Sequence, residues 1–583
     1  MFRVLKQLAW FFKEQKKRYT AAVVLLLVVS VVDLMPALLI GEAVDAFQRG
    51  ALSYSYAFSL IALLVVIIIA SYWISFIWMQ QLFGGAFILE RKLRSRFMRH
   101  LFAMDPPFFE KRKTGDLLAR GTNDMKAISM TAGFGILTLL DSVLFMGILL
   151  AAMVLLIDWR LTLAAVAPLP LIALVVTILG SMIHSRFSKA QEAFGDLNNR
   201  VLESVAGMRV IRAFRSERRD EKLFAEKSND VYKRYMQVAR VESIFDPVVN
   251  MVVGLSYVIG LGYGAYLVFH QQVTLGQIVT FNMYLGMLIW PMFAIGELVN
   301  IMQRGGASYD RVNDTLTVEK AVQAPDVPVE GLGNHLPIRY EKVSFSYPGA
   351  KGNQLENVSL TINKGETIGI VGKTGSGKST FVKQLMKYYP GLSGNISFAG
   401  VSIADLPQEE IRGAIGYVPQ DHVLFSKSVR ENILFAADGA TEAQLNEAIE
   451  ASAFAQDLAF LPEGLDTLVG ENGVSLSGGQ KQRISIARAL VTKPELLILD
   501  DSLSAVDAKT EAKIVANIQK ERAGQTTIIT THRMSAVEHA DQIIVLEDGK
   551  VVEQGTHAQL MEEGGWYAEQ VRNQSLGEEE VNV

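Results

Sequence analysis

Long apolar windows alternate with charged stretches over the first three hundred residues of the chain. A helix needs about 20 apolar residues to cross a bilayer, and several windows reach that length. These windows are Tyr19–Ile40, Ala57–Met79, Thr131–Ile157, Leu161–Ile183, Val248–Phe269 and Ile278–Met302. The hydropathy pattern therefore predicts an all-α membrane domain of six transmembrane helices over residues 19–303.

Two of the connecting loops, Gly84–Ala127 and His184–Val241, are too long for turns and carry helical patterning. We expect the membrane helices to continue through them beyond the bilayer and to turn back through short segments. These two loops are rich in Lys and Arg. By contrast, the only basic residue in the loop after the first window is Arg49, and the only one after the third window is Arg160. Because basic loops stay on the cytoplasmic side, the pattern predicts a multi-pass plasma-membrane protein with both termini in the cytoplasm.

The segments outside the membrane windows differ in composition. Residues 1–18 are basic and predict an amphipathic helix on the inner membrane surface. The apolar face of this helix is expected to hold Phe2, Leu5, Leu8, Ala9 and Phe12. Residues 304–335 read as a linker, residues 336–575 as a soluble α/β domain, and the acidic residues 576–583 as a disordered tail.

The composition excludes some chemistry. The 583 residues include no Cys, so disulfides, thiolate metal sites and cysteine nucleophiles are excluded. The formal net charge of −4 does not decide for or against nucleic acid. Basic clusters beside spanning helices are explained by membrane orientation, so we expect a lipid bilayer and no nucleic acid among the partners.

The stretch Gly372–Thr380 follows the apolar run Ile368–Val371 and precedes a segment with helical periodicity. Strand, glycine loop and helix form the context in which the pattern G-x-x-x-x-G-K-[ST] binds phosphate. Glycines let several backbone N–H groups converge on phosphate oxygens, and the start of the helix adds its dipole. Lys378 is expected to reach the β- and γ-phosphates and Ser379 to bind Mg²⁺. The chain is therefore expected to bind a nucleoside triphosphate.

Three later segments add candidate chemistry. In Leu476–Gln480, Ser477 stands where the N-cap of a helix belongs, which indicates either a second anion site or simply a capped helix. A buried-strand pattern ends at Asp500, where a carboxylate can hold Mg²⁺. Another such strand leads to His532, which is expected at the same sheet edge as the glycine loop.

The order of these motifs resembles the ATPase domain of ABC transporters, and six spans with long inner loops resemble the exporter type. The resemblance covers essentially the whole chain. It implies a half-transporter, in which one membrane domain is fused to one α/β P-loop ATPase domain that couples ATP hydrolysis to transport. Within that family, the chain is similar to one subunit of the heterodimeric bacterial multidrug exporters. The resemblance implies ATP contacts for Tyr347, Gly372, Thr374, Gly375, Ser376, Gly377, Lys378, Ser379, Thr380, Ser477, Gly478, Gly479, Gln480 and Asp507.

The resemblance also implies individual roles. Tyr347 would stack on adenine, for which a flat aromatic face suffices, and Glu471 would contact the inner loops. In the family, two ATPase domains close head to tail. Each ATP then lies between the P-loop of one subunit, here Gly372–Thr380, and the signature segment of the other, here Leu476–Gln480. Mg²⁺ would be held by Ser379, Gln420 and Asp500, and the catalytic residues would be Gln420, Asp501 and His532.

One position departs from the family pattern. Active members usually place Glu directly after the Asp on the Mg²⁺ side, where it polarises the attacking water, and this chain has Asp501 there. A general base has to reach its water, and losing that reach costs a large part of a factor on the order of 10²–10⁴. The signature Leu476–Gln480 is intact. We therefore expect a heterodimer in which a non-identical second half-transporter supplies the Glu.

The sequence says less about the transported substrate than about the nucleotide. Acidic residues inside apolar windows are costly and indicate function. The candidate contacts for an amphiphilic small molecule are Asp33, Asp141, Met287, Trp290 and Glu297, and the carboxylates among them would favour a cationic one. The same side chains could instead face lipid, pack against neighbouring helices or pair with the second subunit. Two other hypotheses agree with most of these motifs. One is a homodimeric lipid flippase, and the other is an ATP-gated membrane protein that does not pump. The membrane windows exclude a soluble ATPase.

Overall fold

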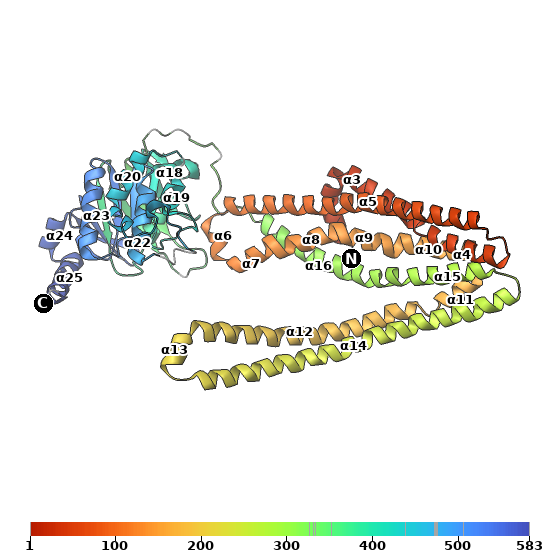
Figure 1. Cartoon of the computed structure of the whole chain (residues 1–583). Helices are drawn as coiled ribbons and strands as arrows, with labels where there is room; N and C mark the ends of the chain where they lie inside the picture. Colours follow the sequence, from red (N-terminus) through yellow and green to blue (C-terminus); the bar gives the residue numbers. More distant parts are fainter. Residues whose placement is uncertain are drawn as a thin grey trace. The chain divides into compact units, whose positions relative to one another are not determined.

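The computed structural model describes residues 2–581, apart from 326, 330, 331, 333, 351, 438, 471–475 and 505. The chain forms two compact units (Figure 1). The first, Met1–Phe102 with Thr114–Val318, is helical, and the second, Ala103–Lys113 with Glu319–Val583, contains both β-sheets. This agrees with the expected fold class, a helical membrane domain fused to an α/β domain.

The helical unit consists of long helices interrupted at a few positions. Its α-helices are α1 (Arg3–Gln7), α2 (Ala9–Glu14), α3 (Lys16–Val32), α4 (Met35–Gln48), α5 (Tyr54–Ala103), α7 (Thr114–Ala119), α8 (Met125–Met130), α9 (Ile136–Leu140), α10 (Met146–Leu156), α11 (Trp159–Val166), α12 (Pro170–Ala206), α13 (Met208–Ala213), α14 (Glu217–Phe269), α15 (Leu275–Met287) and α16 (Ile289–Leu316). Three π-helical turns, Arg120–Asp124, Thr131–Gly135 and Asp141–Phe145, join α7 to α10 into one rod. The expected continuation of the membrane helices into the long loops is confirmed, since α5 and α14 have 50 and 53 residues.

Five helical stretches of the described residues are long and apolar enough to cross a membrane. They are Lys16–Gln48, Tyr54–Ala103, Thr114–Leu156, Glu217–Phe269 and Leu275–Leu316, and each contains or overlaps one predicted window. The remaining window, Leu161–Ile183, is divided between α11 and α12. Pro168 and Pro170 stand at the division, where proline removes an N–H donor and clashes with the preceding turn.

Three terminal or connecting segments differ from the expectation. The predicted linker is helical at its start, because α16 runs to Leu316 with Gly305, Ser308 and Val312 buried at helical spacing. Over its described residues, the acidic tail is the end of helix α25 (Trp566–Val581). At the amino terminus, the predicted Leu5, Leu8 and Phe12 do pack into the helical unit, but Val4 and Phe11 are buried with them, whereas Phe2 is 43% exposed. That packed face joins the core of the helical unit with Trp78 and Met302.

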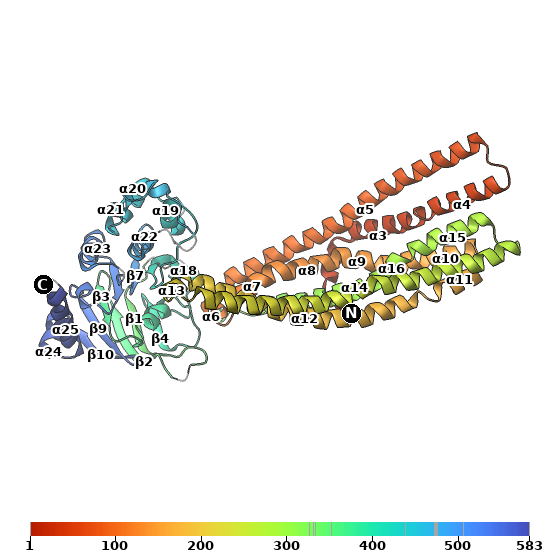
Figure 2. The same ribbon diagram turned by 60° about the horizontal axis from the view of Figure 1, so that its bottom comes forward.

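The second unit is built on two sheets. The antiparallel sheet has the order β2-β1-β4-β5, and the larger sheet has the order β10-β9-β3-β8-β7-β6 (Figure 2). The strands are β1 (Ile338–Phe345), β2 (Leu355–Ile362), β3 (Thr367–Val371), β4 (Ser393–Phe398), β5 (Val401–Ser402), β6 (Ile415–Val418), β7 (Leu496–Asp500), β8 (Thr526–Thr530), β9 (Gln542–Glu547) and β10 (Lys550–Gly555). Strands β3 and β6 to β9 are parallel. Their carboxyl ends therefore share one edge, which is where open α/β sheets bind ligands.

Further α-helices of the second unit follow β3 along the chain. They are α17 (Lys378–Leu385), α18 (Gln408–Ala414), α19 (Val429–Ile433), α20 (Glu442–Ala451), α21 (Ala455–Leu458), α22 (Gly478–Leu490), α23 (Ala508–Glu521), α24 (His557–Glu563) and α25. Alternate residues of β7 enter different cores, because Leu497 and Leu499 pack into one apolar cluster and Leu496 and Ile498 into the other. Such burial on both faces explains the continuous apolar run before Asp500.

A short helix from the first inner loop, α6 (Pro106–Glu110), belongs to the second unit. Asp105 lies at its start and accepts hydrogen bonds from Gln408 Nε2 at 3.1 Å and from the main-chain N–H of Val322 at 3.0 Å. At its end, Glu110 accepts a hydrogen bond from the Tyr389 hydroxyl. The tip of this membrane-helix loop is thus fixed at both ends by the α/β unit.

Candidate nucleotide site

The glycine loop connects the carboxyl end of β3 to the first turn of α17. Gly377 is the N-cap of α17 and has a φ of 105°, in the left-handed region that glycine tolerates. A Cβ atom added to Gly372 would lie 2.2 Å from the Leu546 carbonyl oxygen, so only glycine fits there. Thr374 and Gly375 are exposed at the top of the loop. The predicted strand, loop and helix context of the phosphate-binding pattern is therefore present.

The ammonium group of Lys378 contacts the backbone of this loop. Its Nζ donates hydrogen bonds to the carbonyl oxygens of Gly372 at 2.8 Å and Lys373 at 3.0 Å. Partial burial lowers the pKa of Lys378, and the nearby carboxylates of Asp501 and Asp500 counter part of that effect. A glycine loop with converging N–H groups and a Lys ammonium group attracts phosphate oxygens.

Asp500 ends β7 and is 1% exposed. Its carboxylate accepts hydrogen bonds from Ser379 Oγ at 2.8 Å, Thr530 Oγ1 at 2.7 Å and the Tyr417 hydroxyl at 3.0 Å. The structure thus brings together Ser379 and Asp500, two of the three predicted Mg²⁺ ligands. Thr530 and Tyr417 were missed from the sequence, although both are hydroxyl residues near the carboxyl ends of strands that flank β7.

The three predicted catalytic side chains also meet. Asp501 has a φ of 48°, and its Oδ1 lies 2.9 Å from His532 Nδ1. Its Oδ2 accepts a hydrogen bond from Gln420 Nε2 at 3.3 Å. The backbone of Asp501 is fixed by Thr530, whose carbonyl oxygen and hydroxyl accept from the Asp501 N–H at 2.9 and 3.1 Å. This carboxylate is therefore held by one group on each oxygen.

The residues present fit a divalent cation bound together with a nucleotide. Ser379 and Asp500 offer hard oxygen atoms, which suit Mg²⁺. Among the described residues, no cluster of three or more His, Asp or Glu side chains is arranged to hold a metal. Mg²⁺ is commonly held by one or two protein ligands together with substrate phosphates and water. The Ser376 hydroxyl, buried in the loop, has no hydrogen-bond partner within the described residues, which agrees with a loop built around a phosphate.

Tyr347, the predicted adenine contact, lies beside the loop helix. Its hydroxyl is 3.1 Å from Thr380 Oγ1. Its ring packs edge-to-face against Phe345 and Tyr389, at centroid distances of 5.0 and 4.9 Å. An aromatic residue is thus held at the rim of the loop, supported by two further rings.

The signature segment forms the predicted N-cap of α22. Ser477 Oγ accepts a hydrogen bond from the Gln480 N–H at 3.3 Å, and Gln480 Oε1 accepts one from the Ser477 N–H at 3.0 Å. No hydrogen bond or ion pair between described residues joins this segment to the glycine loop, so the two phosphate elements do not meet within one chain here. Asp507 caps α23 and accepts from the Thr510 N–H at 3.0 Å, and hydrogen bonds from the Thr510 side chain and main chain lower the pKa of its carboxyl group. Glu471 lies outside the described residues.

Comparisons with known proteins agree with this geometry. Residues 19–292 match the family described as ABC transporter transmembrane region, and residues 355–504 match the family described as ABC transporter. The chain is 54% identical over 576 residues to the probable multidrug resistance ABC transporter ATP-binding/permease protein YheI of Bacillus subtilis, covering 99% of this chain and 98% of that protein. The chain belongs to the ABC transporter family.

Other relatives of this ABC transporter differ in their described activities. The multidrug resistance-like ATP-binding protein MdlA of Escherichia coli is 38% identical, covering 98% of this chain and 97% of that protein. An ATP-dependent lipid A-core flippase of Pseudomonas fluorescens is 33% identical, with coverages of 84% and 81%. A bacterial Atm1-family ABC exporter with ATP bound has the same fold, with a TM-score of 0.77, 26% identity and coverages of 96% and 99%. The chain is thus an exporter-type half-transporter that binds ATP and couples its hydrolysis to transport.

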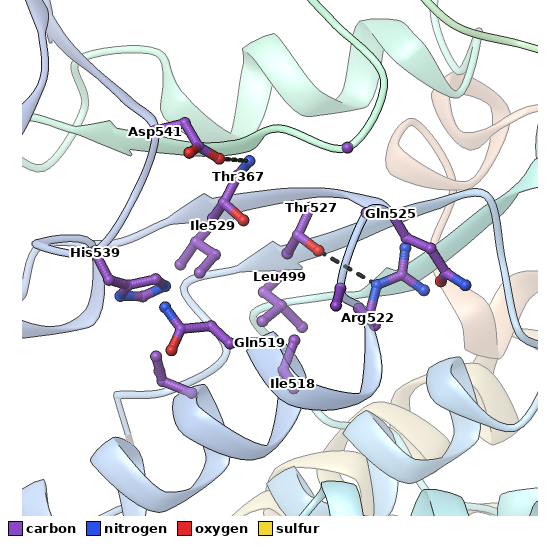
Figure 3. A pocket seen from close by; sticks show the side chains of 14 residues that line it. Thr367, Leu499, Ile518, Gln519, Arg522, Gln525, Thr527, Ile529, His539 and Asp541 are labelled. Atoms are coloured by element: carbon purple, nitrogen blue, oxygen red, sulfur yellow. Dashed lines mark hydrogen bonds between the residues drawn. The ribbon is translucent and has the colours of Figure 1, made fainter.

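A hollow of about 230 Å³ in the ATPase unit of the transporter lies where β3 and β8 begin (Figure 3). Arg522 is buried there and donates hydrogen bonds to Thr527 Oγ1 and to the Thr526 carbonyl, while Asp541 accepts one from the Thr367 N–H. Burial lowers the pKa of Arg522 to about 10. Because ligands bind at the carboxyl ends of parallel strands, this hollow is separate from the nucleotide site.

The membrane domain of the transporter contains a cavity of about 1060 Å³. Two predicted substrate contacts, Trp290 and Glu297, line it, together with the unpredicted His184 and Phe245. Asp141 is linked to this wall, because its Oδ2 accepts a hydrogen bond from Trp290 Nε1 at 3.1 Å.

The other two predicted substrate contacts are not among the residues that line this cavity. Asp33 accepts a hydrogen bond from Ser71 Oγ at 2.6 Å, and Met287 packs against an apolar cluster of the membrane domain. His184 and Phe245 were missed because the face that a long helix turns toward a cavity depends on its packing.

Proposed function

We propose that this chain is one half of a heterodimeric ATP-driven exporter of amphiphilic compounds, with a degenerate ATP site on its own P-loop. The protein would act in the plasma membrane by alternating access, with both termini and the ATPase domain, residues 336–575, in the cytoplasm. The observation that carries the proposal is Asp501, which stands where the family's catalytic Glu is expected. The proposed roles of the other site residues follow the family pattern given above.

The surroundings of Asp501 support a weakened catalytic base. Its two oxygens are engaged by His532 and Gln420, at 2.9 and 3.3 Å. The side chain is one methylene shorter than Glu, and its backbone is tied to Thr530. A base that cannot extend toward the attacking water loses a large part of its typical contribution, on the order of 10²–10⁴. ATP binding depends on the loop and Lys378 and is expected to persist.

The chain combines an intact signature segment with a weakened catalytic base. This combination favours a dimer with a non-identical partner. Ser477 and Gly479 would complete the ATP site of a second half-transporter, and that partner would supply a catalytic Glu. The separation of the signature from the P-loop within the described chain is in line with this arrangement. We propose that Ser379, Gln420 and Asp500 hold Mg²⁺, which neutralises phosphate charge when it is bound.

The membrane cavity supports an amphiphilic substrate with a cationic group. Trp290 is 55% exposed and offers an aromatic face, and Glu297 lines the same cavity. Aromatic faces and carboxylates together attract cations. The multidrug descriptions of YheI and MdlA support a drug-like substrate.

The Asp501→Glu variant tests the degenerate site. We expect it to raise ATP turnover at the site formed by this P-loop, toward the missing factor on the order of 10²–10⁴. The matched Asp501→Asn variant should lose little ATP turnover at this site, because the wild-type Asp501 already contributes little to hydrolysis there. Turnover is measured on the chain alone and on the complex with its partner. Hydrolysis by the wild-type chain alone at typical enzyme rates, about 10 per second, would contradict the proposal.

A homodimeric lipid flippase is the second candidate, and its support is the similarity to lipid A-core flippases. Native mass spectrometry of the affinity-purified chain separates the two readings. A heterodimer predicts a second, non-identical subunit at one-to-one stoichiometry, whereas a flippase of the competing type predicts two identical subunits.

A further inference from the structure

The two oxygens of the Asp500 carboxylate have different hydrogen-bond donors. Oδ1 accepts from Ser379 Oγ at 2.8 Å and from Thr530 Oγ1 at 2.7 Å, whereas Oδ2 accepts from the Tyr417 hydroxyl at 3.0 Å. A carboxylate oxygen offers about two acceptor positions. Oδ1 is therefore fully used, and Oδ2 keeps one position that no described residue occupies. If the hydrogen bonds from Ser379 and Thr530 are kept, a cation or water molecule can contact Asp500 only through Oδ2.

The direction of that remaining position depends on Tyr417. The terminal torsion of an Asp side chain is broad, so donors have to fix the plane of the carboxylate. Strand β7 lies between β6 and β8, and the parallel register places Asp500 beside Thr530 and Tyr417 beside Ile498. Thr530 therefore holds the carboxylate from one neighbouring strand, and Tyr417 holds it from the other.

The same strand end also orients the neighbouring acid. Three residues after Tyr417, Gln420 donates a hydrogen bond to Asp501 Oδ2 at 3.3 Å. The segment that leaves β6 thus contacts both consecutive carboxylates, Asp500 through a hydroxyl and Asp501 through an amide.

We propose that Tyr417 is a positioning residue for the divalent cation that accompanies ATP, because its hydroxyl orients Oδ2 of Asp500 for that cation. The inference rests on the proposed assignment of Mg²⁺ to Ser379 and Asp500. Tyr417 acts through the carboxylate and does not itself bind the metal. Groups that orient a metal ligand in this way typically contribute 10- to 100-fold to metal affinity.

The Tyr417→Phe variant tests this role, since it keeps the ring and removes only the hydroxyl. The full-length protein is reconstituted in lipid nanodiscs with its partner and a non-hydrolysable ATP analogue. Mn²⁺ replaces Mg²⁺, and its binding is followed by electron paramagnetic resonance. We expect Mn²⁺ affinity at the site of this chain to fall about tenfold, with unchanged affinity for the analogue in the absence of metal. Sites on the partner contribute the same signal to wild type and variant.

The matched control is Tyr567→Phe. Tyr567 is 0% exposed, and its hydroxyl lies 2.8 Å from His557 Nδ1. Its loss removes a buried tyrosine hydroxyl from the same unit without touching Asp500, so Mn²⁺ affinity should stay at the wild-type value. Thermal unfolding of both variants shows whether either substitution damages the fold.

Three results would overturn the inference. One is unchanged Mn²⁺ affinity in Tyr417→Phe, and another is an equal loss of metal-free nucleotide affinity, which would make the tyrosine a wall of the pocket. The third is a further loss when Tyr417→Phe is added to Asp500→Ala, because a residue that acts through the Asp500 carboxylate has no effect once that side chain is removed. A wild-type complex without nucleotide-dependent Mn²⁺ binding at this chain would instead refute the proposed Mg²⁺ site.

Discussion

The first and sixth spans are joined at a buried carboxylate, Asp45, at the ends that we assign to the cell exterior. Asp45 is 7% exposed, and its Oδ2 accepts from Thr274 Oγ1 at 2.5 Å. Its Oδ1 accepts from the main-chain N–H of Gly276 at 2.7 Å. The backbones are so close that a Cβ atom on Gly276 would lie 2.0 Å from the Gly41 carbonyl oxygen. Helices α4 and α15 are thus clamped together at this end.

Removal of this clamp should favour the outward-open form. Hydrogen bonds to charged groups contribute about 1.5–3 kcal/mol each, so Asp45→Ala removes about 3 kcal/mol at the low end of that range. About 1.4 kcal/mol corresponds to a tenfold change in an equilibrium. We expect these helix ends to part when the exporter releases its substrate outside. We therefore expect the ratio of outward-open to inward-open protein to rise on the order of 10².

Spin labels at Phe47 and Leu275, which are 74% and 43% exposed, report the separation of α4 and α15. Without nucleotide, Asp45→Ala should show the longer distance that wild type shows only with ATP. The matched control is Asp158→Ala. Asp158 also accepts two hydrogen bonds, from the N–H groups of Arg160 at 2.8 Å and Leu161 at 2.9 Å, but within its own segment. A nucleotide-free distance distribution of Asp45→Ala identical to that of wild type would refute the reasoning.

Two further predictions concern the ATPase core and the cavity. Arg483→Gln should destabilise the ATPase unit by about 3–5 kcal/mol, measured by calorimetry, because it leaves the buried Asp457 carboxylate without its two-bond partner at 2.7 and 2.9 Å. Arg430→Gln, which breaks an exposed ion pair with Glu442, should cost at most about 1 kcal/mol. Asp141→Asn should slow export of cationic dyes from vesicles more than export of neutral ones, and equal rates for both would remove Asp141 from substrate recognition.

Features that depend on local pattern could be predicted from the sequence. The strand and helix that flank the P-loop and the N-cap at Ser477 were confirmed, because each is encoded within a few consecutive residues. The strand ending at Asp500 was predicted from its apolar run, and its parallel neighbours then brought Ser379 and His532 to the same sheet edge. Local chemistry therefore gave the main parts of the candidate nucleotide site.

Features that depend on register or packing could not be predicted in this way. The contact of Tyr417 with Asp500 exists because two strands far apart in sequence align in parallel. His184 enters the cavity wall through the rotation of α12, which hydropathy does not encode. The amino-terminal helix buries Val4 and Phe11 in place of Phe2 for a similar reason, since its partner is the helical unit itself.

The position of α6 has a consequence for dissection of the protein by proteases. The chain enters the ATPase unit at residues 103–113, leaves it, and returns at residue 319. Cleavage of the segment between α16 and β1 would therefore cut only one of the connections between the two units. Fragments nicked there should co-migrate in native gels and separate only in denaturant, because α6 keeps its bonds to Gln408 and Tyr389.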